Sequence, residues 1–166
     1  MEASVSGTKP PAEAGRARVA PGVIRGINAH GERTFPEECC GILLGVTEGK
    51  DHIILESQEL DNLQDENRKR RFYITPGQYR AAEREAAARK LDLLGFYHSH
   101  PDHPAIPSAF DTEHALPWFT YIIVSVRAGR AGDVTAWILS DARDHFLERH
   151  MSVSEEKGMP LAPTPN

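Results

Sequence analysis

Residues that could bind a metal and do chemistry lie close together between residue 98 and residue 111: His98, His100, Ser108 and Asp111. His98 and His100 are one residue apart, so on a strand both imidazoles point to the same face. Asp111 follows on the next turn of the chain and can supply a carboxylate, which completes a donor set typical of Zn²⁺. Because three protein ligands leave a fourth position open for water, the pattern predicts a catalytic rather than a structural zinc site.

Each of these residues also has a structural interpretation. A single buried histidine is usually a packed core residue, and Ser108 with Asp111 reads as the N-cap of a short helix followed by an acidic third residue. The combination of all these residue types at these offsets favours the catalytic interpretation. His103 and His114 are competing ligand candidates, which we expect beside the ligands or at the surface. The other histidines have no ligand partners at useful spacing and are expected to be solvated: His30, His52, His145 and His150.

The surrounding elements must place these side chains. The apolar run of residues 93–97 leads directly into His98, as in a buried central strand. Thr75, Pro76 and Gln78 supply an N-cap, a proline in the first helical position and a capping-box partner, so a helix should run to about residue 90. Another helix is expected over residues 21–33. Strands are expected over residues 40–46, 53–55, 72–74, 93–97, 119–126, 134–139 and 146–151.

Strands and helices alternate along the chain before the sheet ends in hairpin-linked strands. This order favours an α/β sandwich with a mixed sheet and helices on its faces. We expect one domain over residues 21–151, a disordered N-terminal tail over residues 1–20 and a flexible C-terminal tail over residues 152–166. Both tails are rich in small, polar and proline residues, which cannot offset the entropy of ordering.

The spacing His98-x-His100-Pro101, six residues, then Ser108-x-x-Asp111 resembles the signature of the JAMM, or MPN-plus, zinc metallopeptidases. The resemblance covers about residues 21–146 and implies that family's mixed-sheet, cytidine-deaminase-like fold. The family also has an upstream glutamate three residues before a Gly-x-x-x-Gly strand, a position that Glu38 occupies here. Glu37 is the alternative, but neighbouring residues on a strand face opposite ways.

Carried over to this chain, the resemblance implies Zn²⁺ on His98, His100 and Asp111. It implies that Glu38 is the general base and that Ser108 donates its hydroxyl to the oxyanion. The implied reaction is the hydrolysis of an amide or isopeptide bond without a covalent intermediate.

The family cleaves after the C-terminal Gly-Gly of ubiquitin or ubiquitin-like proteins. This chain has little room for the insertions of the eukaryotic members and resembles the stand-alone prokaryotic type. The implied substrate is therefore a ubiquitin-like sulfur-carrier protein, from which the enzyme releases a C-terminal cysteine or trims the tail. The region from residue 66 to residue 90, which includes Arg70 and Arg71, carries a local charge of +5. This region is either a solvated surface or a docking face for an acidic partner.

The overall charge of -5 argues against a general nucleic-acid or anionic-membrane surface. The chain shows neither a signal-peptide core nor a membrane-length apolar run, so we expect a cytoplasmic protein. Cys39 and Cys40 are adjacent, which makes them poor disulfide partners, and we expect them to be buried packing residues.

Two other functions compete with the peptidase: a metal-free binding scaffold of the same fold, and a zinc enzyme that acts on nucleobases or nucleic acids. A non-catalytic MPN-type binding scaffold would have broken ligand positions, but every motif position here is intact. A zinc-dependent nucleobase deaminase would need a Pro-Cys-x-x-Cys signature, which the sequence lacks. A nucleic-acid enzyme would need a broader basic face than the short run of residues 68–71.

Overall fold

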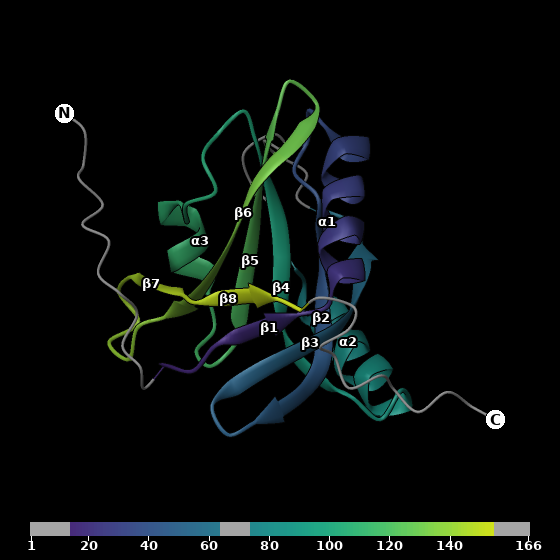
Figure 1. The fold of residues 1–166 in the computed structure, drawn as a ribbon, viewed down its shortest axis with the longest axis vertical. Coiled ribbons are helices and arrows are strands. Elements are labelled where there is room, and N and C mark those ends of the chain that lie inside the picture. Colours follow the sequence, from purple (N-terminus) through teal and green to yellow (C-terminus); the bar gives the residue numbers. More distant parts are fainter. Residues whose placement is uncertain (1–13, 64–73, 155–166) are drawn as a thin grey trace.

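A computed structural model describes residues 14–63 and 74–154. Within them, eight strands form one sheet in the order β7-β6-β5-β4-β2-β3-β1-β8. The strands are β1 (Ala17–Val19), β2 (Cys40–Glu48), β3 (Asp51–Leu60), β4 (Asp92–Pro101), β5 (Thr120–Arg127), β6 (Arg130–Leu139), β7 (Phe146–Arg149) and β8 (Met151–Val153). The helices are α1 (Pro21–Thr34), α2 (Pro76–Ala88) and α3 (Ala109–His114) (Figure 1).

The sheet is mixed and carries a hydrophobic core on each face. β4 lies between β2, to which it is antiparallel, and β5, to which it is parallel. Successive residues of β5 point alternately into the two cores. Ile122 and Val124 pack with α1, whereas Tyr121 and Ile123 pack with α2. The predicted α/β fold with a mixed sheet and flanking helices is confirmed.

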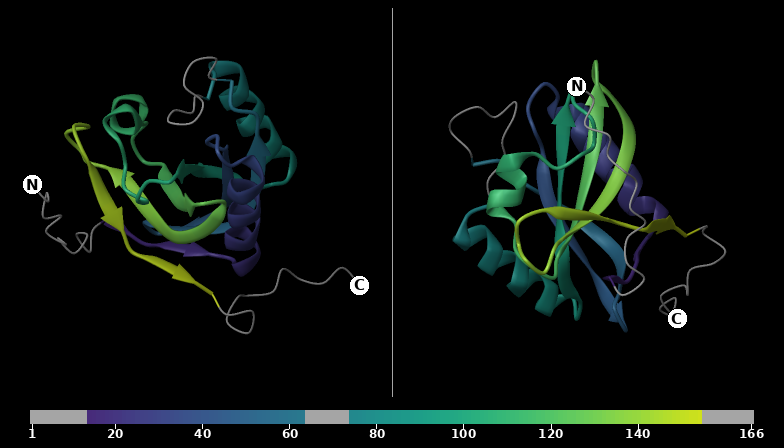
Figure 2. Two further views of the ribbon diagram at one scale, coloured as in Figure 1. Left: turned by 90° about the horizontal axis from the view of Figure 1, so that it is seen from above. Right: turned by 90° about the vertical axis from the view of Figure 1, so that its left-hand side faces the viewer.

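The two ends of the sheet are joined by one extended segment. β7 pairs with β6, β8 pairs with β1, and only His150 separates β7 from β8. Figure 2 shows this segment crossing the long central strands. Both outermost positions in the sheet are thus occupied by one continuous stretch of chain, which bends the sheet towards closure.

This closure corrects both predicted tails. The prediction of a disordered tail over residues 1–20 is wrong for Ala17–Val19, which forms β1 and buries Ala17 and Val19 completely. The predicted flexible tail over residues 152–166 is wrong at its start, because β8 extends to Val153. Each strand has three residues, too few to show a periodicity, and is held by parallel pairing with distant segments.

The predicted helices are confirmed with small changes at their ends. α2 begins with a complete capping box, in which Thr75 Oγ1 accepts a hydrogen bond from Gln78 N and Gln78 Oε1 accepts one from Thr75 N. Gly41 of β2 is required by close packing, because a Cβ there would lie 2.2 Å from the Tyr97 ring. No helix in the described part of the chain is long and apolar enough to cross a membrane. The predicted strand at 72–74 and the basic run with Arg70 and Arg71 fall in residues that are not described, except Ile74, which is not in a strand.

Candidate metal centre

His98 and His100 lie near the carboxyl end of β4, the central strand predicted from the apolar run before them. Their residues are 1% and 6% exposed. Because they are two residues apart on the strand, both imidazoles lie on the same face of the sheet. β5 pairs with both residues and β2 pairs with His98, so sheet hydrogen bonding fixes the backbone that carries the two side chains.

Asp111 reaches the same point from the first turn of α3. Ser108 Oγ accepts a hydrogen bond from Asp111 N at 3.1 Å, and Ser108 N donates one to Asp111 Oδ2 at 2.8 Å. This reciprocal capping box fixes both the start of the helix and the direction of the Asp111 carboxylate. The helix-cap and ligand interpretations of Ser108 and Asp111 are therefore compatible.

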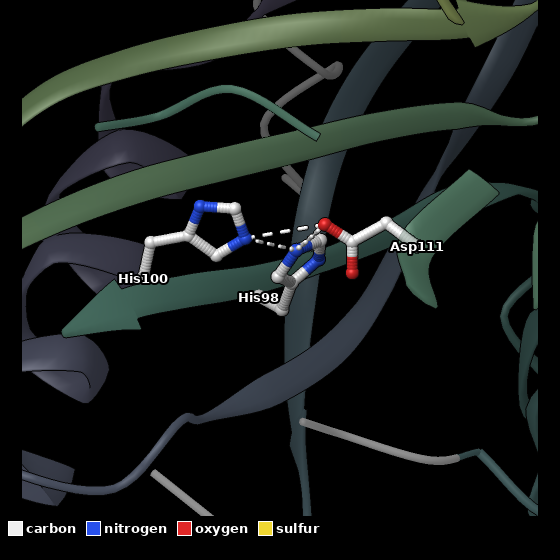
Figure 3. Close-up of side chains that lie close together, drawn as sticks. All are labelled: His98, His100 and Asp111. Atoms are coloured by element: carbon white, nitrogen blue, oxygen red, sulfur yellow. Dashed lines mark hydrogen bonds and ion pairs between the residues drawn. The ribbon is translucent and has the colours of Figure 1, made fainter. Parts of the chain in front are cut away.

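The three side chains meet at one point (Figure 3). The Nε2 atoms of His98 and His100 are 3.1 Å apart, and each lies 3.2 Å from Asp111 Oδ2. Donor atoms around a tetrahedral Zn²⁺ at about 2.05 Å are separated by about 3.3 Å, close to these distances. The residues therefore fit a small divalent cation.

The hydrogen bonding of His100 supports the same fit. Its Nδ1 lies 2.8 Å from the carbonyl oxygen of Pro104, which only accepts, so Nδ1 carries the proton and Nε2 presents a lone pair towards His98 and Asp111. Burial lowers the pKa of His98, which favours the neutral imidazole. Burial alone would raise the pKa of Asp111, but the two neighbouring histidines and the hydrogen bond from Ser108 N hold it well below its usual range.

Glu38 lies in the segment just before β2 and is 3% exposed. Its Oε2 is buried and has no hydrogen-bond partner among the described residues. Burial, followed by the charge of Asp111, raises the pKa of Glu38 to about 9. A cation held by the histidines and Asp111 would oppose both effects. The alternative, Glu37, is exposed.

Two cavities flank the three candidate ligands. One, of about 360 Å³, is lined by Glu38, His100, His103, Ser108 and two apolar residues of the intervening loop. The other, of about 410 Å³, contains His98 and Asp111 and is otherwise mainly aromatic and aliphatic; its lining includes Tyr79, Phe96, Phe110, Leu116 and Tyr121.

His103 and His114 lie near the centre but outside it. His103 lines the cavity that contains Glu38, and His114 lines the cavity that contains Asp111, where its ring packs on Phe110 at 4.1 Å. Neither belongs to the group of donor atoms that lie within 4.8 Å of one another, which comprises His98, His100 and Asp111. Their expected positions beside the ligands or at the surface are confirmed.

The prediction of solvated side chains is wrong for His30 and His52, which are 7% and 2% exposed. His30 Nδ1 lies 2.7 Å from the hydroxyl of Tyr97, and His52 Nδ1 lies 2.8 Å from Thr120 Oγ1. Each partner is more than sixty residues away in sequence, so spacing gave no signal of the contact. His145 and His150 are exposed, as expected. The thiols of Cys39 and Cys40 are free and buried, as predicted.

Comparison with known proteins gives relatives over most of this region. A family model for prokaryotic homologs of the JAB domain matches residues 21–140. A desampylase from Pyrococcus furiosus is 32% identical over 105 residues, which are 63% of this chain and 68% of that protein. A desampylase from Haloferax volcanii is 31% identical over 91 residues, 54% of this chain and 63%, or slightly less than two thirds, of that protein. A JAB1/MPN domain protein from Archaeoglobus fulgidus shares the fold, with a TM-score of 0.52 at 17% identity over 84% of this chain and 97% of that chain.

Proposed function

The chain belongs to the family of prokaryotic JAB-domain proteins, and on that premise we propose that it is a zinc-dependent peptidase or isopeptidase. Its substrate would be a ubiquitin-like or sulfur-carrier protein, cleaved at the amide bond after a C-terminal Gly-Gly. The observation that carries the proposal is the convergence of His98 Nε2, His100 Nε2 and Asp111 Oδ2 at 3.1–3.2 Å beside a buried Glu38. A binding scaffold would have no need for such an arrangement.

His98, His100 and Asp111 would hold the zinc ion. When bound, zinc would polarise the scissile carbonyl and lower the pKa of water to about 7. The chain contributes the orientation of the ligands, because the Pro104 carbonyl fixes the His100 tautomer and the Ser108 backbone amide fixes Asp111. Such supporting hydrogen bonds keep the donor atoms directed at the ion.

Glu38 would act as the general base and then as the general acid. Its carboxylate lines the same cavity as His100 and Ser108, and Oε2 has no competing partner within the described chain. It would take a proton from the attacking water and return it to the leaving amine, a role typically worth about 10² to 10⁴ in rate.

Ser108 would stabilise the developing oxyanion. Its Oγ already accepts a hydrogen bond from Asp111 N, which leaves its own O–H proton available to donate into the cavity that it shares with Glu38. Loss of such a donor costs about 10² to 10³ in kcat.

The proposed substrate rests on the relatives and on the form of the site. The curated relatives are desampylases, a name that refers to a ubiquitin-like protein as substrate. A Gly-Gly tail suits a groove in which the substrate backbone must approach buried ligands closely. The product would be a carrier that ends in Gly-Gly together with a released cysteine or short peptide. The reduced thiols of Cys39 and Cys40 are compatible with the cytoplasmic location that we propose.

The test is cleavage of a ubiquitin-like carrier extended by a few residues after Gly-Gly, with mass spectrometry to locate the cut. Zinc-loaded protein should cut after the second glycine, and excess chelator should stop the reaction until zinc is restored. A matched carrier with Ala-Ala in place of Gly-Gly should be cut poorly. Full activity in excess chelator would rule out the zinc enzyme, and binding of the carrier without cleavage would favour the scaffold.

A further inference from the structure

A second polar cluster surrounds Arg149, the last residue of β7, where the chain crosses from β6 towards β1. Arg149 is 2% exposed and contacts Thr120, the first residue of β5, and His52 of β3. Thr120 pairs with Gly95 of β4, whereas His98 pairs with Ile123, so the cluster lies towards the amino end of β5. By strand alternation Thr120 is on the face of Ile122, opposite to that of Ile123 and the metal centre.

The hydrogen bonds of Arg149 all go to uncharged groups. Nη1 donates to Thr120 Oγ1 at 2.8 Å and lies 3.2 Å from His52 Nδ1, while Nη2 donates to the Lys50 carbonyl at 2.6 Å. Because burial, and then the Arg149 charge, lowers the pKa of His52 to about 4, that imidazole is neutral and accepts at Nδ1. Nε is buried without a partner in the described chain.

No carboxylate in the described part of the chain forms an ion pair with Arg149. The nearest acidic influence is Asp51, whose carboxylate lies 3.7 Å from Arg18 and also accepts a hydrogen bond from Arg16 N. A buried cation without a partner is costly, and proteins normally pair it. The cluster is therefore short of a negative charge.

The cluster opens into a cavity of about 610 Å³, which is in the size range of small-molecule sites. Its charged lining residues are Lys50, Arg143 and Arg149 against one acid, Asp141. Trp118 forms another part of the wall: it is 50% exposed, has a φ of 77° and packs on His52 at 4.5 Å. A bulky residue keeps such a backbone conformation only where its surroundings require it.

We propose that this cavity binds a phosphorylated small molecule, with its phosphate against Arg149 and the rim residues Lys50 and Arg143, and its organic part against Trp118. Arginine and lysine are the side chains that recognise phosphate in proteins, and a half-exposed indole offers a flat apolar surface. The cavity shares no lining residue with either cavity of the metal centre, so this site is separate from the proposed catalytic one.

The test is a titration of the full-length, zinc-loaded protein with AMP, inorganic phosphate and adenosine, followed by tryptophan fluorescence. Trp118 lines the cavity whereas Trp137, the second tryptophan, is in the core, so AMP should change the signal saturably with a dissociation constant below about 1 mM. Phosphate should bind more weakly and adenosine should not bind. Equal affinity for phosphate and AMP would contradict the proposed contact between the organic part of the ligand and Trp118. Failure of both to bind would overturn the proposal.

Variants locate the binding. Lys50→Glu and Arg143→Glu change exposed rim residues, so both proteins should fold, and each should weaken AMP binding by about tenfold. Arg130→Glu makes the same charge change in the β5–β6 hairpin, outside the cavity, and should leave AMP binding unchanged. His98→Ala should also bind AMP normally, because His98 does not line this cavity. This result would show that AMP binding does not require the metal centre, and it does not depend on the proposed peptidase activity. Binding that is lost in His98→Ala, or is equally weak in Arg130→Glu, would contradict the assignment.

Discussion

The metal centre and the Arg149 cluster present opposite kinds of buried group. At the end of β4, donor atoms of His98, His100 and Asp111 converge within 3.2 Å, an arrangement that suits a cation. Around Arg149, the hydrogen-bond partners of a buried cation are all uncharged, an arrangement that suits an anion. Buried polar groups are normally satisfied, so the two proposed ligands have opposite charges: a cation at the first site and an anion at the second.

The largest effect expected separates metal binding from catalysis within the first cluster. Glu38→Gln should keep a full zinc complement but lower hydrolysis by about 10² to 10⁴, because the proposed general base is lost while the three candidate ligands stay. His98→Ala and Asp111→Ala should lose both zinc and activity. Metal analysis beside kcat/KM on the extended carrier measures the two properties separately.

Glu37→Gln is the matched control for this prediction. Glu37 is the sequence neighbour of Glu38 and carries the same group, but it is exposed and does not line the cavity beside His100. It should hydrolyse the carrier at the normal rate. Inactivity of Glu37→Gln with normal Glu38→Gln would reverse the assignment of the base, and a full zinc complement in His98→Ala would contradict the ligand set.

Removal of zinc should give the next largest effect, on stability. A ligand present at about 1,000 times its dissociation constant stabilises the folded state by about 4 kcal/mol, so chelator should lower the Tm of wild-type protein substantially. The same chelator should not change the Tm of His98→Ala, which has already lost the ion. An equal Tm shift in both proteins would place the stabilising metal outside this centre. The first cluster would then not be the cation site of the molecule.

The two clusters also differ in how far the sequence predicts them. All three candidate ligands lie within residues 98–111, on one strand and the helix that follows, so their spacing reflects local geometry. The capping boxes at Thr75 and Ser108 are visible for the same reason. Glu38 is sixty residues from His98, and only the family resemblance indicated it.

The Arg149 cluster has no such local pattern. Arg149 is 97 residues from His52, and His52 is 68 residues from Thr120. The contacts depend on β7 and β8, which close the sheet against β1, a strand too short to show a periodicity in the sequence. Burial of His52 and Arg149 is thus a property of the topology, which single-sequence patterns do not encode.

Acid should weaken the Arg149 cluster through His52. The folded protein keeps His52 neutral, with its pKa lowered to about 4, whereas the unfolded chain takes up a proton below about pH 6.5. The stabilisation from neutral His52 is therefore complete above pH 6.5 and is lost as the pH falls towards 4. Between pH 7 and pH 5 the loss should be about 1–2 kcal/mol.

Urea unfolding of wild type and His52→Gln across this pH range gives the unfolding free energy of each protein, and their difference measures the contribution of His52. Because both proteins contain the metal centre, its acid sensitivity cancels in this difference. The difference should shrink as the pH falls. His145→Gln changes an exposed histidine and serves as the control, with a constant difference from wild type. A constant difference for His52→Gln as well would mean that His52 has the same pKa in the folded and the unfolded chain, which would contradict this prediction.

The smallest effect compares the capping boxes of α2 and α3. Thr75 Oγ1 and Ser108 Oγ each accept a hydrogen bond of 3.1 Å from the backbone amide three residues later. Thr75→Ala and Ser108→Ala should therefore each cost about 1 kcal/mol of unfolding free energy, as judged by urea denaturation in chelator. In zinc-loaded protein the two losses should remain equal, because the bond that directs the Asp111 carboxylate comes from Ser108 N, which alanine keeps. A larger loss for Ser108→Ala with zinc than without it would show that the Ser108 hydroxyl also helps to hold Asp111 in place. The metal centre would then depend on Ser108 as well as on its three candidate ligands.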